Sequence, residues 1–208
     1  MVTELLDLKN TVLYRDNINK AAQALLAGRI VAFPTETVYG IGVNANDSAA
    51  IDHLYSMKER PGNKQLAIMI AESDDVAKYV NEIPTIAKVL IDSFWPGPLT
   101  IVFMLHNDKS IGIRNSSNNV VSDLIRAANV AIASTSANIA GKQPAANAQQ
   151  VIDNLGDKVD MILDGGPAQS RTPSTVVKVK EDRFEILRYG IIKEESIKRC
   201  LNESSVSV

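Results

Sequence analysis

Short apolar runs alternate along the chain with amphipathic segments and with polar turns that contain glycine or proline. Residues 30–33, 66–70 and 99–105 are almost entirely apolar, which is typical of strands buried on both faces of a sheet. The remaining strands are expected at residues 110–114, 130–133, 161–163, 175–180 and 184–187, and helices at residues 17–27, 73–80, 84–94, 120–128, 146–155 and 193–201. The turn at residues 181–183 predicts an antiparallel hairpin. We therefore expect a single α/β domain around a twisted sheet of mixed parallel and antiparallel strands.

The strand predicted at residues 30–33 leads into a polar loop. Pro34 ends the strand because proline has no backbone N–H to donate. Three hydroxyls and a carboxylate follow at the carboxyl end of the strand, the edge where open α/β sheets bind ligands; they belong to Thr35, Glu36, Thr37 and Tyr39. Gly40 and Gly42 predict a bend or the close approach of another group. A strand, a proline turn and a glycine bend would explain each residue alone, but the density of polar side chains favours a binding site.

Two cations lie at the end of a predicted helix. Leu54 and Tyr55 mark this helix, Pro61 must end it, and Lys58 and Arg60 come just before the proline. The residue before a proline is pushed into an extended conformation, so Arg60 can turn toward the target of Lys58. The pair predicts an anion site at a solvent-facing helix end, although the helix macrodipole alone also favours cations there.

Two more strands end in polar residues. Arg114 stands at the carboxyl end of the strand predicted at residues 110–114. The segment Ser134-Thr135-Ser136-Ala137-Asn138 follows the strand at residues 130–133 and puts four hydrogen-bonding side chains into five residues. These side chains suit a bound phosphate or carboxylate, and they equally suit a turn in which hydroxyls cap their own backbone.

Composition limits the classes of function. The 208 residues are 45% hydrophobic and 22% charged with a net charge of −2, which gives no sign of a generally nucleic-acid-binding surface. No apolar run approaches the ~20 residues of a membrane span, and the first residues lack the features of a secretion signal. Cys200 is the only cysteine, which excludes an intrachain disulfide and argues against a zinc cluster. We expect a cytoplasmic protein with no membrane partner.

Common catalytic motifs are absent from the sequence. His53 and His106 are the only histidines and have no metal-ligand spacing, and neither Ser136 nor Cys200 lies in a signature for nucleophilic catalysis. A phosphate-binding Gly-x-x-x-x-Gly-Lys-Ser/Thr loop is missing as well. The polar residues at strand ends suit chemistry done by positioning and electrostatic stabilisation.

Six segments, in order along the chain, resemble the motifs of one known family. They are Pro34-Thr-Glu-Thr-Val-Tyr-Gly-Ile-Gly42, Lys58-Glu-Arg60-Pro61, Phe94-Trp-Pro-Gly-Pro-Leu-Thr100, Ser134-Thr-Ser-Ala-Asn138 with Gly141, Asp164-Gly-Gly166, and Pro173-Ser-Thr-Val176 with Leu187-Arg188. On these segments the chain is similar to the threonylcarbamoyl-AMP synthases of the YrdC-like family over about residues 15–192. The resemblance implies the short form of that family, with one YrdC-like domain over residues 1–208 and a helical tail at residues 193–208.

The resemblance also implies an activity. Family members make L-threonylcarbamoyladenylate and pyrophosphate from L-threonine, bicarbonate and ATP, with Mg²⁺ carried by ATP and no tightly bound protein-ligated metal. The product would pass to tRNA-threonylcarbamoyl transferase proteins, which form N6-threonylcarbamoyladenosine at position 37 of tRNA. Related proteins are described as binding tRNA or double-stranded RNA, so an RNA-binding module of the same fold without the chemistry is the alternative. A carbamoyl-adenylate-handling domain of the hydrogenase-maturation type is a further one.

Carried over to this chain, the resemblance implies three sets of site residues. The catalytic set is Lys58, Arg60, Ser136 and Asn138, the threonine-binding set is Thr37, Arg114, Ser134, Ser136 and Ser174, and the ATP-binding set is Arg60, Lys64, Ser110, Ser136, Pro144 and Arg188. Arg114 would then suit a two-nitrogen grip on the carboxylate of the amino acid. Lys58, Arg60 and Arg188 would suit the charge that develops as pyrophosphate leaves.

The chain departs from the family pattern at three places. Gln65 replaces a usual proline, Met69 replaces a histidine that contacts threonine in many members, and Asn115-Ser116 replaces the proline-containing continuation after the arginine. These changes bear on the threonine side of the expected pocket. The segment after Arg188 is expected to be available as a partial lid.

Overall fold

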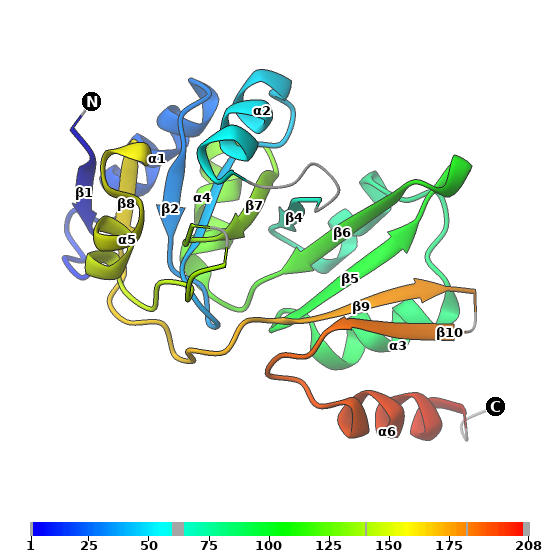
Figure 1. Ribbon diagram of the computed structural model, residues 1–208. Helices are drawn as coiled ribbons and strands as arrows, with labels where there is room; N and C mark the ends of the chain where they lie inside the picture. Colours follow the sequence, from blue (N-terminus) through cyan, green and yellow to red (C-terminus); the bar gives the residue numbers. More distant parts are fainter. Residues whose placement is uncertain (1, 60–64, 140, 182, 206–208) are drawn as a thin grey trace.

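Ten strands form one mixed sheet in the computed structural model, which describes residues 2–59, 65–139, 141–181 and 183–205. The strand order is β1-β8-β2-β3-β7-β4-β6-β5-β9-β10 (Figure 1). The strands are β1 (Glu4–Asp7), β2 (Val31–Phe33), β3 (Gly40–Asn44), β4 (Ala67–Ile70), β5 (Leu99–Met104), β6 (Ser110–Asn115), β7 (Ile132–Ser136), β8 (Met161–Asp164), β9 (Thr175–Lys180) and β10 (Arg183–Arg188). The predicted α/β class and mixed sheet are confirmed, as is the hairpin, since β9 and β10 pair antiparallel.

Helices and short 3₁₀ segments connect these strands. The described helices are α1 (Tyr14–Leu26), α2 (Ser48–Met57), α3 (Thr85–Phe94), α4 (Asn119–Ala128), α5 (Ala148–Leu155) and α6 (Glu194–Ser205), and the 3₁₀ segments are η1 (Ser73–Lys78), η2 (His106–Asp108) and η3 (Gly156–Lys158). The prediction of a regular helix at residues 73–80 was therefore wrong in type, because this segment is the short 3₁₀ turn η1. Such turns form where too few residues are available for a stable α-helix.

The half of the sheet from β1 to β7 is covered by helices on both faces. In β2, Val31 and Phe33 face the core formed with α1 and α4, whereas Ala32 faces the core formed with α2 and α5. This alternation follows from the period of two of a strand, and it explains why the run is apolar throughout. Figure 1 shows α2 and α5 beside this half of the sheet.

The other half of the sheet, from β4 to β10, has one face that is left open for a site. Ile101 and Phe103 of β5 point into the core that contains α3 and α6. Thr100 and Val102, which alternate with them, line a pocket on the opposite face. The same alternation continues in β9, where Val177 lies in the core, so the pocket is built on the uncovered face of the sheet.

The described part of the tail does not form a lid over this pocket. Ile192 and Ile197 are buried in the core with α3, beside which Figure 1 shows α6. That core also contains Ile101 and Phe103, so it lies on the face of the sheet opposite to the pocket. Only Leu187 and Arg188, which precede the tail helix, line the pocket. The expectation of a partial lid is thus wrong for α6, because burial of its apolar side holds it on α3.

Two strands were not predicted from the sequence. The strand β1 is a short edge strand in which exposed and buried residues alternate, and it pairs in parallel with β8. The strand β3 contains Gly40 and Gly42, for which the sequence predicts a bend or the close approach of another group, and the close approach is confirmed. A Cβ atom on Gly42 would lie 2.3 Å from Cγ2 of Ile132, so glycine permits β3 to pair closely with β7.

Candidate active site

A pocket of about 650 Å³ lies on the open face of the sheet. This volume falls within the range of about 300–1,000 Å³ that is usual for small-molecule sites. Seven of the predicted site residues line it, namely Thr37, Ser110, Arg114, Ser134, Ser136, Ser174 and Arg188. The structure thus brings together residues that are as far apart in sequence as Thr37 and Arg188.

The pocket lies over the sheet rather than beyond the ends of its strands. Arg114 is inside β6, where it pairs with Met69 of β4. Ser134 and Ser136 are inside β7, opposite Gly42 and Gly40 of β3. The predicted place of Arg114 near the carboxyl end of its strand is confirmed, whereas the prediction that Ser134 and Ser136 follow their strand was wrong. They reach the pocket because alternate residues of a strand project from the same face of the sheet.

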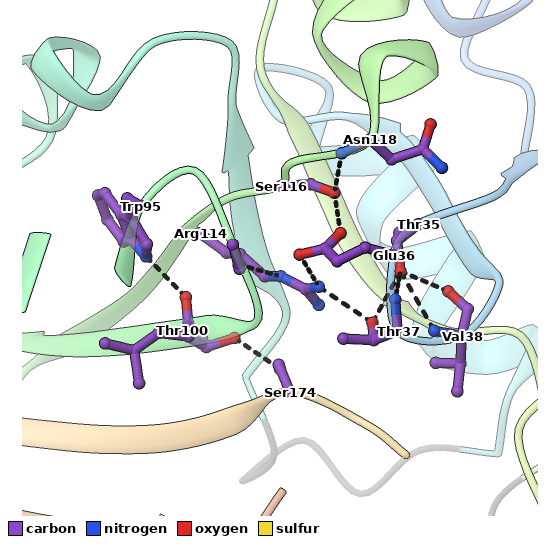
Figure 2. Close-up of polar contacts among 12 residues, drawn as sticks. Thr35, Glu36, Thr37, Val38, Trp95, Thr100, Arg114, Ser116, Asn118 and Ser174 are labelled. Atoms are coloured by element: carbon purple, nitrogen blue, oxygen red, sulfur yellow. Dashed lines mark hydrogen bonds and ion pairs between the residues drawn. The ribbon is translucent and has the colours of Figure 1, made fainter. Parts of the chain in front are cut away.

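The loop after β2 is organised by the hydroxyl of Thr35. Its Oγ1 accepts hydrogen bonds from the backbone N–H groups of Thr37 and Val38 and donates to the carbonyl oxygen of Val38 at 2.6 Å (Figure 2). Since that hydrogen is used, the bond of 2.7 Å between Oγ1 of Thr35 and Oγ1 of Thr37 must be donated by Thr37. The hydroxyl of Thr37 therefore meets a ligand as a hydrogen-bond acceptor.

Arg114 is held in a buried ion pair at the side of the pocket. Its Nη2 atom donates to Oε1 of Glu36 at 2.9 Å and to Oγ1 of Thr37 at 3.0 Å, and its Nε faces the carbonyl oxygen of Gly97 at 3.4 Å (Figure 2). Arg114 is 7% exposed and Glu36 is 6% exposed. Both hydrogens of Nη2 are used, so the expected two-nitrogen grip on a carboxylate is not available in this arrangement.

The remaining nitrogen of Arg114 is the one left for a ligand. Among the described residues, none accepts a hydrogen bond from Nη1, and no buried side-chain nitrogen or oxygen lacks a partner. Nη1 must therefore be accessible to solvent, and Arg114 is one of the residues that line the pocket. One nitrogen with two N–H groups is available for an anionic group of a ligand.

Lys58 is buried behind the pocket, which corrects the prediction of a solvent-facing cation. It is the C-terminal capping residue of α2 and is 2% exposed. Its Nζ donates to the carbonyl oxygen of Ser136 at 2.6 Å and to Oγ1 of Thr135 at 3.2 Å. Ser136 in turn donates from Oγ to Oδ1 of Asn138 at 2.5 Å. The three described members of the predicted catalytic set are therefore linked to one another, and Ser136 is the one that lines the pocket.

On the far side of the pocket, Ser174 joins two strands. Nη2 of Arg188 donates to Oγ of Ser174 at 2.9 Å, and its Nε donates to the carbonyl oxygen of Ser174 at 3.0 Å. The same Oγ lies 3.0 Å from Oγ1 of Thr100 on β5. Ser174, which is assigned to threonine binding, is therefore bonded directly to a cation assigned to ATP binding.

The remaining predicted site residues are Ser110, Pro144, Arg60 and Lys64. Ser110 lines the pocket and donates from Oγ to Oε1 of Gln65 at 3.2 Å. Pro144 is partly buried and does not line the pocket. Arg60 and Lys64 lie outside the described residues.

Tyr39 fixes the end of the loop to a distant turn. Its hydroxyl donates to the carbonyl oxygen of Gly166 at 2.7 Å, and its backbone N–H donates to that of Ala145 at 2.8 Å. Burial, and secondly the charge of Asp164, raise the pKa of the Tyr39 phenol well above its ordinary value of 10.0. Tyr39 is therefore a neutral hydrogen-bond donor at physiological pH, with a structural role.

Three residues of the site received no role from the sequence. Glu36 was noted in the polar loop, Ser116 was noted only as a departure from the family pattern, and Thr100 was read as part of an apolar strand. The hydroxyl of Ser116 donates to Oε2 of Glu36 and accepts from the backbone N–H of Asn118 at 3.2 Å (Figure 2). A carboxylate between two threonines, directly after an apolar strand, was the available signal for Glu36.

A metal-binding cluster and a membrane-spanning helix are both absent from the described residues. These residues contain no group of three or more His, Cys, Asp or Glu side chains placed to hold a metal ion. None of the helices formed by them has the length and apolar character needed to cross a bilayer.

Sequence comparison relates the chain to one protein family. Residues 23–190 match the Sua5_yciO_yrdC family, which is described as telomere recombination. A threonylcarbamoyl-AMP synthase of Pyrococcus abyssi is 34% identical, over 89% of this chain and 57% of that protein. Another of Bacillus subtilis is 35% identical, over 88% of this chain and 56% of that protein. The chain thus spans a little more than half of the length of these two relatives.

Structural comparison agrees. The crystal structure of Pyrococcus abyssi Sua5 complexed with L-threonine superposes with a TM-score of 0.89 and 32% identity, covering 98% of this chain and 62% of that one. The crystal structure of Escherichia coli YciO superposes with a TM-score of 0.79, covering 88% of this chain and 93% of that one. At 22% identity, this second likeness concerns the fold alone.

Proposed function

Because this chain belongs to the Sua5/YciO/YrdC family, we propose that it is an L-threonylcarbamoyladenylate synthase, a nucleotidyltransferase that uses L-threonine, bicarbonate and ATP. The observation that carries the proposal is the pocket in which Arg114 lies among hydroxyl side chains, on a fold that superposes on a threonine-bound relative. An amino acid with a hydroxyl needs such a mixture of one cation and several hydroxyls.

The threonine side of the pocket follows from the hydrogen bonds already made. Nη1 of Arg114 would bind the carboxylate of threonine, because Nη2 and Nε are engaged with protein oxygens. Thr37 would accept a hydrogen bond from the amine or hydroxyl of the substrate. Ser134 and Ser174, which also line the pocket, would complete the contacts with the substrate hydroxyl.

The ATP side would be formed by the cation at the other end of the pocket. Arg188 and Ser110 line the pocket, and the family resemblance adds Arg60, Lys64, Pro144 and Ser136. Mg²⁺ would arrive bound to the triphosphate, as is usual for nucleotide substrates. The cations would offset the charge that develops on the phosphates as pyrophosphate leaves.

The reaction balances without a covalent enzyme intermediate. The amine of threonine would bond to the carbon of bicarbonate with loss of water, which gives a carbamate. A carbamate oxygen would then bond to the α-phosphorus of ATP while the bond to pyrophosphate breaks. The main contribution of the protein would be to position the three substrates in one pocket. Lys58 would support this by holding the strand of Ser136 in place.

The product would serve the modification of tRNA. An acyl adenylate is an activated group, so a transferase must consume it, and we assign this role to tRNA-threonylcarbamoyl transferase proteins acting at adenosine 37. An RNA-binding module without chemistry is less well supported. Its ligand would need an open basic surface, whereas the polar residues here line a pocket of about 650 Å³.

The test is an assay of pyrophosphate release in which threonine and bicarbonate are omitted in turn. We expect release to require both substrates together with ATP and Mg²⁺. Release that continues unchanged without threonine would contradict the proposal. Arg188→Ala gives a second test, because the KM for ATP should rise more in this variant than the KM for threonine.

A further inference from the structure

Glu36 lies behind Arg114, outside the set of residues that line the pocket. Its two carboxylate oxygens are used separately, with Oε1 accepting from Nη2 of Arg114 at 2.9 Å and Oε2 accepting from the hydroxyl of Ser116. Ser116 is itself held by the backbone N–H of Asn118, the residue that caps α4. A chain of contacts therefore runs from the start of α4 to the guanidinium (Figure 2).

This series of contacts determines which nitrogen of Arg114 is available to bind a ligand. An arginine side chain has several rotatable bonds and loses conformational freedom when it binds. Glu36 and Thr37 occupy both hydrogens of Nη2, which leaves Nη1 toward the pocket. Without Glu36, Nη2 would lose its charged partner, and only the weaker contacts with Thr37 and Gly97 would hold the guanidinium.

We propose that Glu36 is a positioning residue for the substrate carboxylate, acting through Arg114, and that Ser116 holds Glu36 in place. The proposal rests on the proposed function, because that function assigns Arg114 to the carboxylate of threonine. It adds a role for Ser116, which stands where the family usually continues differently. Arg188 lies on the other side of the pocket, at Ser174, and should not respond to changes at Glu36.

The test measures threonine and ATP separately in Glu36→Ala, Glu36→Gln and Ser116→Ala. In Glu36→Ala, we expect the KM for threonine, and its Kd by calorimetry without ATP, to rise roughly 10- to 100-fold, the range of a lost charge-assisted hydrogen bond. The kcat and the KM for ATP should stay within about threefold, since the ATP contacts are not touched. Glu36→Gln keeps an oxygen acceptor for Nη2 and should recover most of the affinity.

Ser116→Ala tests the same series of contacts without removing the ion pair between Glu36 and Arg114. We expect a rise of about three- to tenfold in the KM for threonine, the effect of one neutral hydrogen bond. The matched control is Glu72→Ala, which removes an exposed carboxylate paired with Arg126 and should leave every constant unchanged.

Two outcomes would overturn the proposal. One is unchanged threonine binding in both Glu36→Ala and Ser116→Ala, and the other is an equal loss of threonine and ATP affinity, as a general disturbance of the fold would cause. If Glu36→Ala does not fold, Ser116→Ala decides by the same criteria. Failure of the proposed function would be seen differently, as wild-type protein that does not bind threonine at all.

Discussion

The ammonium group of Lys58 lies 2.6 Å from the carbonyl oxygen of Ser136, so a side chain at the end of α2 holds the last residue of β7. This contact makes Lys58 both a buried structural residue and a direct hydrogen-bond partner of the backbone of the predicted catalytic serine. Substitution of Lys58 should therefore affect stability and activity together.

Lys58→Met keeps the length of the side chain and removes its charge. We expect the rate of pyrophosphate release to fall by about 100-fold, because Lys58 holds the strand of Ser136 and a small misplacement of a positioned group can cost about that much. The free energy of unfolding should also fall by about 1–3 kcal/mol, because the carbonyl of Ser136 loses a donor. Urea unfolding and steady-state kinetics measure the two effects.

Lys88→Met is the control for this prediction, since Lys88 is an exposed lysine on α3. It should change neither quantity. A Lys58→Met protein as stable as the wild type would show that the contact with Ser136 contributes nothing to the fold.

Gly190 should not tolerate a side chain. A Cβ atom there would lie 2.4 Å from both the carbonyl oxygen of Pro173 and the backbone nitrogen of Thr175. Gly190→Ala should therefore push Ser174 away from Arg188 and lower the free energy of unfolding by about 1–3 kcal/mol. Thermal unfolding and the KM values for threonine and ATP check this, and both KM values should rise.

Gly112→Ala is a matched control for the stability effect. Its added Cβ would lie 3.7 Å from Cγ2 of both Thr100 and Val102, which is ordinary van der Waals contact. We expect its free energy of unfolding to stay within about 1 kcal/mol of the wild type. If Gly190→Ala were equally harmless, the segment after β10 would not be held against Ser174 as described.

We expect the pocket to recognise the hydroxyl group of the amino acid substrate. The remaining acceptor site of Thr37 and the hydroxyls of Ser134 and Ser174 lose a partner if valine replaces threonine, and such a loss at a site built for a hydroxyl costs roughly 10⁴-fold. Serine lacks only a methyl group and should be discriminated against by about 10- to 200-fold. Met69, which lines the pocket, offers apolar contact to that methyl.

The measurement is kcat/KM for threonine, serine and valine with ATP and bicarbonate saturating. The expected order is threonine, serine, valine. Equal turnover of serine and valine would mean that the hydroxyl is not recognised.

Tyr39 should make the fold sensitive to alkaline pH. Its folded pKa is raised above the ordinary value of 10.0, so between these two pKa values the unfolded chain releases a proton that the folded chain keeps. The stabilisation is fully present below pH 10 and is lost as the pH rises toward the folded pKa, at up to about 1.4 kcal/mol per pH unit.

Tyr39→Phe removes this titration, and the free energy of unfolding should then fall less steeply above pH 10 than in the wild type. At neutral pH the variant should be less stable by about 1 kcal/mol, because the hydrogen bond to Gly166 is lost. Urea unfolding from pH 8 to pH 11 gives both quantities, and parallel curves for the two proteins would refute the prediction.

The sequence by itself determined the class of fold and most of the pocket. Apolar runs such as residues 99–105 predict strands because burial on a sheet requires them, and the hairpin turn requires a mixed sheet. The polar residues after β2 and around Ser136 indicated a site because several hydrogen-bonding groups are rarely placed together without a use. The motifs then identified which family to expect.

Tertiary structure alone decided which hydrogen bonds these residues make. The expected exposure of Lys58 was wrong because its environment depends on β7, 77 residues further along the chain at Thr135. The pairing of Arg114 with Glu36 spans 78 residues, and no local pattern predicts such a contact. Periodicity reports which face of an element is buried, but which polar groups meet, and so which nitrogen remains for a ligand, is fixed only when distant strands are brought together.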